Sequence, residues 1–374
     1  MNKRLLTVPA AVVAGVALLT AATFYWQDNN DNNDVSNIGL TNPAMARTAS
    51  LPAPQSFDGD AVRDVLARDA IPAIDKPQFV SASEAKIAPD APVIGVSIGG
   101  EHHAYSLHLL NGHEIVNDVV GGKPIATTWC PLCNTSIVYS RKVEDRVLSF
   151  GVSGKLWRNS LVMYDRETET LWSHISGEAM AGPLKGKSLQ AVAGTPRIQW
   201  KDWKRQHPDT KVLSVNGRED APDNYVGYHA SPDIGIHGGQ AQDARITAKS
   251  PVIGVTAGKA AKAYPLSAFT EYSVIADRIG GKPLLIFHDV PSGATAVYEA
   301  TVGERIVQPV EKAKGFTVND KQGNRWNFIT GVALEGPARG QTLKRVPHFR
   351  GYWFAWSDFH PQTELLRGAA KKDE

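Results

Sequence analysis

The sequence predicts a mostly β fold of the α+β kind: two tandem duplicated antiparallel β domains with few short helices. Three observations support this prediction. Short runs rich in β-branched and aromatic residues are separated by Gly, Asn and Asp, which is typical of strands and hairpins. The same sequence blocks occur twice in the same order. The length of 374 residues suits two domains and a leader better than one core.

The repeated blocks define the two copies. PVIGV occurs at residues 92–96 and again at 251–255, and GGKP occurs at 121–124 and again at 280–283. Both pairs have the same spacing, and later matches such as Trp172 with Trp326 keep the order. We therefore predict a first domain over 57–215, a linker over 216–249 and a second, degenerate domain over 250–370.

In the first copy, Gly, Asn and Asp punctuate the apolar runs, and His207-Pro208 ends a short helical pattern. We expect helices over 60–69 and 200–207, and a turn over 165–169. We expect strands over 93–97, 125–129, 135–140, 147–150 and 161–164.

The N-terminal segment carries a targeting pattern. Lys3 and Arg4 precede an apolar run, so residues 1–26 are expected to be a signal peptide or N-terminal membrane anchor. The polar residues 27–56 are expected to form a disordered tether. This arrangement predicts an exported protein on the periplasmic side of the inner membrane, anchored or cleaved. The net charge of +2 gives no field that favours a nucleic acid partner.

The duplication also separates scaffold from chemistry. Residues shared by both copies, such as Tyr105 with Tyr264, are expected to be core. Reactive residues found only in the first copy cannot be required by a shared fold. The first copy has His113, Cys130, Cys133, Met163 and His174, where the second has Tyr272, Asp289, Ser292, Val318 and Phe328.

The chain has two cysteines, in the motif Cys130-Pro-Leu-Cys133 between two predicted strands. This placement resembles a metal-binding knuckle, whose backbone N–H groups point at the sulfurs. One such motif supplies two ligands, while a closed zinc site needs four. His113 is the first candidate for a further ligand, Met163 the second, and His174 an additional one. A Cys/Cys/His/Met set is soft and favours copper before zinc, in electron transfer or metal handling. If Glu114 or a second histidine replaced Met163, zinc would be favoured.

Two other functions remain open, so the sequence does not decide whether the protein is an enzyme. In a periplasmic thiol–disulfide oxidoreductase or Cys-nucleophile enzyme, Cys130 would attack, Cys133 would resolve and His113 would act as base. Glu114 is a further candidate catalytic residue, or it orients His113 or a bound water. The third reading is a non-catalytic envelope interaction module. The histidines at 102, 103 and 108 are expected to be solvated near a hairpin.

The motifs TWCPLCNT at 128–135, FGVSGKL at 150–156 and NSLVMYDRET at 159–168 resemble domain-of-unknown-function family 3179. HEIVND at 113–118 and WFAW at 353–356 resemble it as well. The resemblance covers roughly residues 70–366 and implies an exported bacterial or archaeal protein, without an established reaction. It identifies as parts of the family pattern Cys130, Cys133, His113, Glu114 and Met163. Asn134 stands where the family often has Gly, and His174 where it often has Gln.

Overall fold

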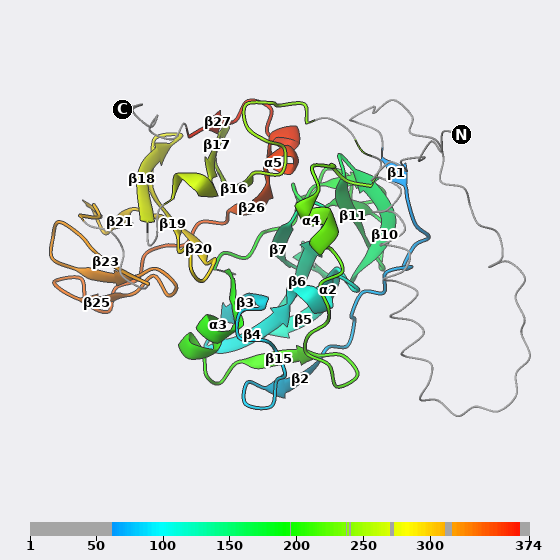
Figure 1. Cartoon of the computed structure of the whole chain (residues 1–374), viewed down its shortest axis with the longest axis horizontal. Helices are drawn as coiled ribbons and strands as arrows, with labels where there is room; N and C mark the ends of the chain where they lie inside the picture. The colour runs from blue at the N-terminus through cyan, green and yellow to red at the C-terminus, as the bar shows by residue number, and fades with distance from the viewer. Residues whose placement is uncertain are drawn as a thin grey trace, which may run out of the picture.

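The computed structural model describes residues 62–366 except 195, 237, 239–240, 270–272 and 311–315. The chain is mostly β, as predicted, with short helices between small sheets (Figure 1). The predicted leader over 1–26 and tether over 27–56 lie outside the described residues. Within the described part of the chain, no helix has the length and apolar character needed to cross a membrane.

The first part of the chain, up to residue 230, contains three of the four α-helices found in the described residues. Its elements are β1 (Arg63–Asp64), β2 (Gln78–Ser81), β3 (Pro92–Ile98), β4 (Glu101–Ser106), α2 (Leu107–Leu110), β5 (Ile115–Val120), β6 (Lys123–Cys130), β7 (Thr135–Ser140), β8 (Lys142–Val143), β9 (Arg146–Val147), β10 (Phe150–Trp157), β11 (Ser160–Asp165), β12 (Leu171–Ser173), β13 (Ala179–Ala181), β14 (Arg197–Gln199), α3 (Trp200–Gln206), β15 (Lys211–Ser214) and α4 (Val226–Ala230).

The second part runs through a similar order of elements. They are β16 (Pro251–Ala257), β17 (Ala260–Pro265), the 3-10 helix η2 (Leu266–Ala268), β18 (Ser273–Ile279), β19 (Lys282–His288), β20 (Thr295–Glu299), β21 (Thr301–Val302), β22 (Arg305–Ile306), β23 (Thr317–Asn319), β24 (Arg325–Asn327), β25 (Ala333–Glu335), β26 (Phe349–Tyr352), α5 (Trp353–Phe359) and β27 (Glu364–Leu365).

Two sheets have matching strand orders, β14-β3-β4-β15-β2 and β26-β16-β17-β27. In both, the central hairpin is antiparallel and one flanking strand, β15 or β27, joins in parallel. In each sheet a tryptophan packs on the first strand of the central hairpin: Trp203 of α3 on β3, and Trp356 of α5 on β16. A Cβ at Gly95 would overlap Trp203, and a Cβ at Gly254 would overlap Trp356. Glycine is therefore required on both strands by close packing of an indole ring.

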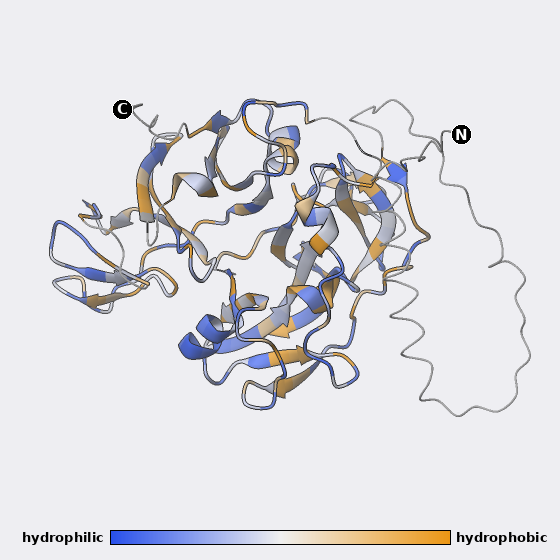
Figure 2. Cartoon of the chain, viewed as in Figure 1, coloured by the Kyte–Doolittle hydropathy of each residue, from blue (hydrophilic) through white to orange (hydrophobic). Residues whose placement is uncertain are grey.

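The sheet β5-β6-β7 is buried on both faces. Successive side chains of a strand point to opposite sides, so Ala126 and Cys130 enter one core while Ile125 and Trp129 enter another. This double burial explains the nearly continuous apolar run before the first cysteine. Figure 2 shows the contrast with α3, which is largely hydrophilic.

The hydrophobic cores join the two parts of the chain. One core contains Cys130 and Met163 from the first part together with Trp353 from α5. Another contains Trp203 from α3 together with Trp326 from β24. Each part therefore contributes a helix to a core built mainly by strands of the other part, and neither of these cores is complete without both.

Several predicted elements are confirmed and two are wrong. The strand over 135–140 and the helix that begins at Trp200 match β7 and α3. Within 62–69 there is no helix: Arg63 and Asp64 form strand β1 on β10, and Asp69 has a φ of 55° that no α-helix accommodates. The strand over 147–150 is also wrong, because β9 ends at Val147 and β10 begins at Phe150.

Candidate functional site

The cysteine motif forms the tip of the β6–β7 hairpin. Cys130 is the last residue of β6 and pairs with Thr135, the first residue of β7. Asn134 closes the turn with a φ of 52°, a left-handed conformation that Asn tolerates better than most residues. The prediction that the motif joins two strands, and does not open a helix, is confirmed.

The two sulfurs are buried, free of a disulfide and hydrogen-bonded to each other. Burial raises the pKa of Cys130, but the Cys133 thiol and the backbone N–H groups of Leu161, Cys133 and Leu132 donate to its sulfur and lower the pKa overall. Burial and the charge of Cys130 raise the pKa of Cys133 well above its usual value. The Sγ of Cys133 also lies 3.3 Å from the carbonyl oxygen of Asn159. The pair is thus asymmetric, because its surroundings favour the thiolate form at Cys130 more than at Cys133.

The β10–β11 hairpin supplies the opposite wall of the site. Arg158 and Asn159 both have positive φ values, 51° and 56°, as expected for a two-residue type I′ turn. This turn brings the Asn159 carbonyl to Cys133 and the Leu161 N–H to Cys130. Two hairpin tips therefore meet at the thiol pair.

Glu114 lies beside Cys130. It is 7% exposed, and burial followed by the charge of Cys130 raises its pKa well above the usual value, which favours the protonated carboxyl group. Its φ of 57° is unusual for a residue with a long side chain. The hydroxyl of Tyr225 is buried without a hydrogen-bond partner among the described residues. Burial is the main cause that raises the pKa of Tyr225, and electrostatic interaction with Glu114 and Cys130 adds to the effect. Cys130, Glu114 and Tyr225 form one polar cluster.

His113 is buried next to Glu114 in the chain. Its Nδ1 lies 2.7 Å from the carbonyl oxygen of Pro72, and burial lowers its pKa, so the ring is neutral. Nδ1 donates to that oxygen, and a metal ion would have to use Nε2.

Met163 and His174 share the face of β11 and β12 that packs on the thiol pair. Met163 pairs with Trp172, and the backbone N–H of His174 donates to Leu161, so the four side chains point to one side of the sheet. Met163 belongs to the same core as both cysteines. His174 is fully buried, with no partner for either ring nitrogen among the described residues, and burial lowers its pKa to about 3.

Among the described residues, no three His, Cys, Asp or Glu side chains lie together as a metal-binding group. A metal ion at the two thiols would therefore depend on the thioether of Met163, or on a movement of His113 or His174. The prediction of these ligands stays a prediction.

The segment predicted as a linker covers the site. The Tyr228 hydroxyl, on α4, donates to the carbonyl oxygen of Leu132 at 2.8 Å and accepts the Gly235 N–H at 3.0 Å. Lys249 Nζ lies 3.4 Å from the centre of the Tyr228 ring. The sequence analysis did not identify Tyr228 as part of the site. The available signal was the pair Tyr225 and Tyr228 at helical spacing within a polar segment.

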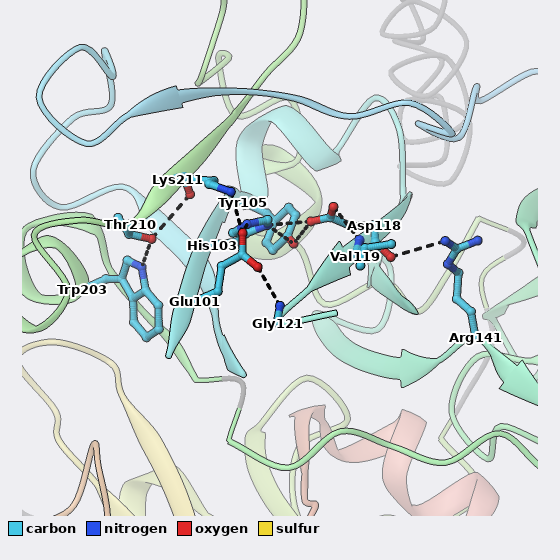
Figure 3. Close-up of polar contacts among 10 residues, drawn as sticks. All are labelled: Glu101, His103, Tyr105, Asp118, Val119, Gly121, Arg141, Trp203, Thr210 and Lys211. Atoms are coloured by element: carbon cyan, nitrogen blue, oxygen red, sulfur yellow. Dashed lines mark hydrogen bonds and ion pairs between the residues drawn. The ribbon is translucent and has the colours of Figure 1, made fainter. Parts of the chain in front are cut away.

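A second polar cluster surrounds His103, away from the thiols (Figure 3). His103 is 2% exposed, with Nδ1 2.7 Å from Asp118 and Nε2 3.2 Å from Glu101, so the prediction of a solvated ring is wrong. The same Asp118 oxygen accepts the hydroxyl of Tyr105 at 2.5 Å. Lys211, then the Gly121 N–H, lower the pKa of Glu101 to about 2. In the second part of the chain, Lys262 and Tyr264 bind Asp277 in the same way. A cluster found in both parts is scaffold.

Comparison with known proteins adds a family assignment to this geometry. The family model described as "Protein of unknown function (DUF3179)" matches residues 68–363, close to the extent expected from the sequence motifs. Neither the curated proteins nor the solved structures contain a match to the chain. The matched range includes both hairpin tips, α4 and the strands β14 and β26. The chain belongs to the DUF3179 family of proteins of unknown function.

Proposed function

We propose that the thiol pair Cys130–Cys133 binds a soft metal ion, copper before zinc, for electron transfer or metal handling. The observation that carries the proposal is the set of N–H groups at one buried sulfur: Leu132 and Cys133 of the turn, and Leu161 of β11, donate to Cys130. Backbone donors stabilise a thiolate, and the thiolate is the form of cysteine that binds metals. An enclosed thiolate beside a second thiol is suited to a cation.

Electrostatics favours occupation of the pair by a cation. Ionised Cys130 raises the pKa of Cys133, so both sulfurs cannot become thiolates at neutral pH without a compensating charge. A metal ion at the two sulfurs supplies that charge and deprotonates coordinating thiols. Its binding would turn the asymmetric thiol pair into two equivalent ligands.

The choice of copper rests on the donors available. Thiolate and thioether ligands select soft ions such as Cu(I). Met163 supplies a thioether in the same core as the two cysteines. A closed zinc site needs four ligands, and the described residues offer no third His, Asp or Glu grouped with the cysteines. His113 through Nε2 and His174 are the nitrogen donors that a local movement could add. Glu114 would orient His113 or a bound water.

The second candidate is a thiol–disulfide oxidoreductase, or a Cys-nucleophile enzyme. It is favoured by the asymmetry of the pair and by the raised pKa of Glu114 beside Cys130. Cys130 would attack a disulfide of the substrate and Cys133 would resolve the mixed disulfide. Two electrons and two protons would pass to the substrate, whose disulfide is reduced as that of the protein forms. Both sulfurs are buried, so this reaction requires the hairpin tip to open.

We also infer that the two parts of the chain are tandem duplicated domains, of which only the first carries the site. Matched hydrogen bonds support this inference. Trp172 and Trp326 donate to Asp165 and Asp320 at 2.9 and 2.8 Å, Trp203 and Trp356 donate to Thr210 and Thr363 at 3.0 and 2.9 Å, and Tyr139 and Tyr298 donate to the carbonyls of His174 and Phe328 at 2.7 and 2.6 Å.

Export to the periplasmic side of the inner membrane completes the proposal. It rests on Lys3, Arg4 and the apolar run that follows them. An oxidising compartment would convert an exposed thiol pair to a disulfide. Burial of both sulfurs, or a bound metal ion, protects the reduced pair there.

The test is the metal content of the full chain after loading with Cu(I) or Zn(II) and removal of unbound metal. We expect about one copper per chain in the wild type, measured by elemental analysis, and its loss in Cys130→Ser. Ser292→Ala changes the equivalent turn of the second part and serves as the matched control, which retains the metal. Absence of both metals in the wild type would contradict the proposal. In that case a reversible disulfide found by thiol trapping supports the oxidoreductase, and a redox-inert pair supports an interaction module.

A further inference from the structure

Strands β14 and β26 hold two arginines at a small cavity between the two parts of the chain. Arg197 lies on β14 and Arg350 on β26, and both line a cavity of about 30 Å³. The two strands occupy equivalent edge positions in the matching sheets. The cavity wall also includes Thr295 and His348 and contains no Asp or Glu.

Arg350 has no acidic partner within the described part of the chain, where no hydrogen bond or ion pair of its guanidinium is found. Burial, followed by the charge of Arg197, lowers its pKa well below the usual value. A Cβ at Gly293 would lie 3.7 Å from its Nη2, so the group packs on the tip of the β19–β20 hairpin. The Arg350 side chain is partly buried, and withdrawal of a cation from water without a counter-charge is costly.

Arg197 is held mainly by neutral groups. Its Nη1 donates to the backbone oxygen of Asn134 at 3.4 Å and to the side-chain oxygen of the same residue. The guanidinium lies 5.3 Å from the centre of the Trp129 ring. Burial lowers its pKa to about 10, opposed by Tyr352 and Asp223. Only Asp223 among these groups is an acid, and it does not line the cavity.

The histidines beside the arginines do not compensate the charge. Burial lowers the pKa of His348 to about 4, with Arg345 and Arg350 adding to the effect, and His288 behaves in the same way. Both rings are therefore neutral at pH 7. The Nε2 of His348 lies 3.2 Å from the hydroxyl of Thr295, so these two groups satisfy each other. The wall keeps two positive charges and no negative one.

We propose that Arg197 and Arg350 bind a small inorganic anion in this cavity. Two guanidinium groups present planar sets of N–H donors that match chloride or the oxygens of a small oxyanion. The cavity of about 30 Å³ exceeds the roughly 10–15 Å³ needed for one water molecule, which favours a small anion such as chloride. The bound charge replaces the missing carboxylate and holds the two parts of the chain together at their contact.

The anion site is linked to the thiol hairpin but does not depend on its chemistry. Arg197 contacts Trp129 and Asn134, the residues that flank the cysteine motif on either side. An anion that orders Arg197 therefore also orders the turn. Failure of metal binding leaves the anion proposal untouched, and failure of anion binding leaves the metal proposal untouched.

The experiment is thermal unfolding of the full chain at constant ionic strength, with gluconate replaced by chloride, sulfate or phosphate. We expect the Tm of the wild type to rise saturably with at least one of them, by about 2–3 °C per tenfold increase above Kd. In Arg350→Met the response is lost. This variant should also be about as stable as the wild type in gluconate, because the charge that it removes is partly buried and has no acidic partner among the described residues. The exposed Arg146→Met is the control and keeps the wild-type response.

Equal anion responses in the wild type and Arg350→Met would overturn the proposal, as would the absence of a response to all three anions. If Arg350→Met does not fold, crystals of the wild type soaked in bromide give a second measurement. An anomalous peak between the guanidinium groups of Arg197 and Arg350 supports the site. A cavity without a bromide peak rejects it.

Discussion

Cys130 and Asp289 lie at equivalent ends of two hairpins and fill the same role in the turn. In the first part, the N–H of Cys133 donates to the Cys130 sulfur. In the second, the N–H and hydroxyl of Ser292 donate to an Asp289 oxygen, the N–H at 3.0 Å. The turn thus needs an acceptor at its first position, and either sulfur or oxygen serves. The scaffold leaves the chemistry of the tip free to change.

The tryptophan–aspartate pairs are scaffold at the same scale, and they give a prediction. Trp172→Phe and Trp326→Phe each remove a donor from a buried carboxylate, at Asp165 and Asp320. Loss of a hydrogen bond to a charged buried group costs about 1.5–3 kcal/mol. We expect both variants to lower the free energy of unfolding by similar amounts in this range, measured with urea.

The control for this comparison is Val226→Ala, whose side chain is 61% exposed and whose loss should change little. A cost below about 0.5 kcal/mol for either tryptophan, which is the range of surface changes, would show that the pair is not part of the scaffold.

At the scale of elements, strand β26 contacts the tip of the β6–β7 hairpin, although the two belong to different sheets. The N–H of Tyr352 donates to the carbonyl oxygen of Cys133 at 2.9 Å. The reciprocal contact exists on the other side, where the N–H of Gln199 donates to Ser292 at 3.0 Å. Each hairpin tip therefore contacts a strand of the other part, β26 before α5 in one case and β14 before α3 in the other. Chemistry at the thiols depends on both halves of the chain.

Gly351→Ala tests the contact between β26 and the hairpin tip. A Cβ at this position would lie 2.8 Å from the Cys133 carbonyl oxygen and would overlap the Thr135 hydroxyl. Overpacking of this kind costs about 1–3 kcal/mol, and we expect a lower urea midpoint together with weaker retention of copper.

Gly227→Ala is the matched control, because it lies on the covering helix α4 and a Cβ there meets nothing within 4 Å. Its stability should be equal or slightly higher. Unchanged stability and metal retention in Gly351→Ala would contradict the contact between β26 and the hairpin.

At the scale of the whole molecule, the exchange of helices between cores makes the described chain one cooperative body. Trp353 completes a core of the first part and Trp203 a core of the second. Unfolding one half exposes apolar surface of the other. Strands of both parts also line the arginine cavity. The charges of Arg197 and Arg350 therefore lie at a contact between the two parts.

Buried histidines set the response of the whole molecule to acid. Burial lowers to about 4 the pKa values of His207, His229, His288 and His348. Unfolded histidines take up protons near pH 6.5, so the stability that these four rings contribute is fully present above that pH and falls between pH 6.5 and 4. Glu114 and Asp358 have raised pKa values and act in the opposite direction, but they are fewer. We therefore expect urea midpoints to fall from pH 7.5 to pH 5.

His207→Asn removes one of these groups and should flatten the profile, because Asn does not titrate. The His207 ring stacks on His102 at 4.0 Å, so the comparison is made on the slope with pH and not on absolute stability. A wild-type profile that is flat or rises toward pH 5 would contradict the expectation.

Sequence reasoning found the strands, the position of the thiol turn and the family to which the chain belongs. It also found matched residues such as Tyr105 and Tyr264, whose burial the structure confirms. Local sequence patterns predict these features: alternation along strands, turn residues and ordered repeats. It misjudged residues 62–69 of the predicted helix, residues 147–150 and the surroundings of His103, where partners far along the chain override the local pattern.

By itself the sequence determined the mostly β character, the hairpin that carries Cys130 and Cys133, and membership of the family. Only the tertiary structure decided which groups surround the sulfurs: Leu161 from another hairpin, Tyr228 from the connecting segment and Tyr352 from the far end of the chain. It alone brought Arg197 and Arg350 to one cavity. The physical reason is that hydrophobic periodicity depends on near neighbours, whereas burial, pKa shifts and charge compensation depend on contacts between residues that are distant in the sequence.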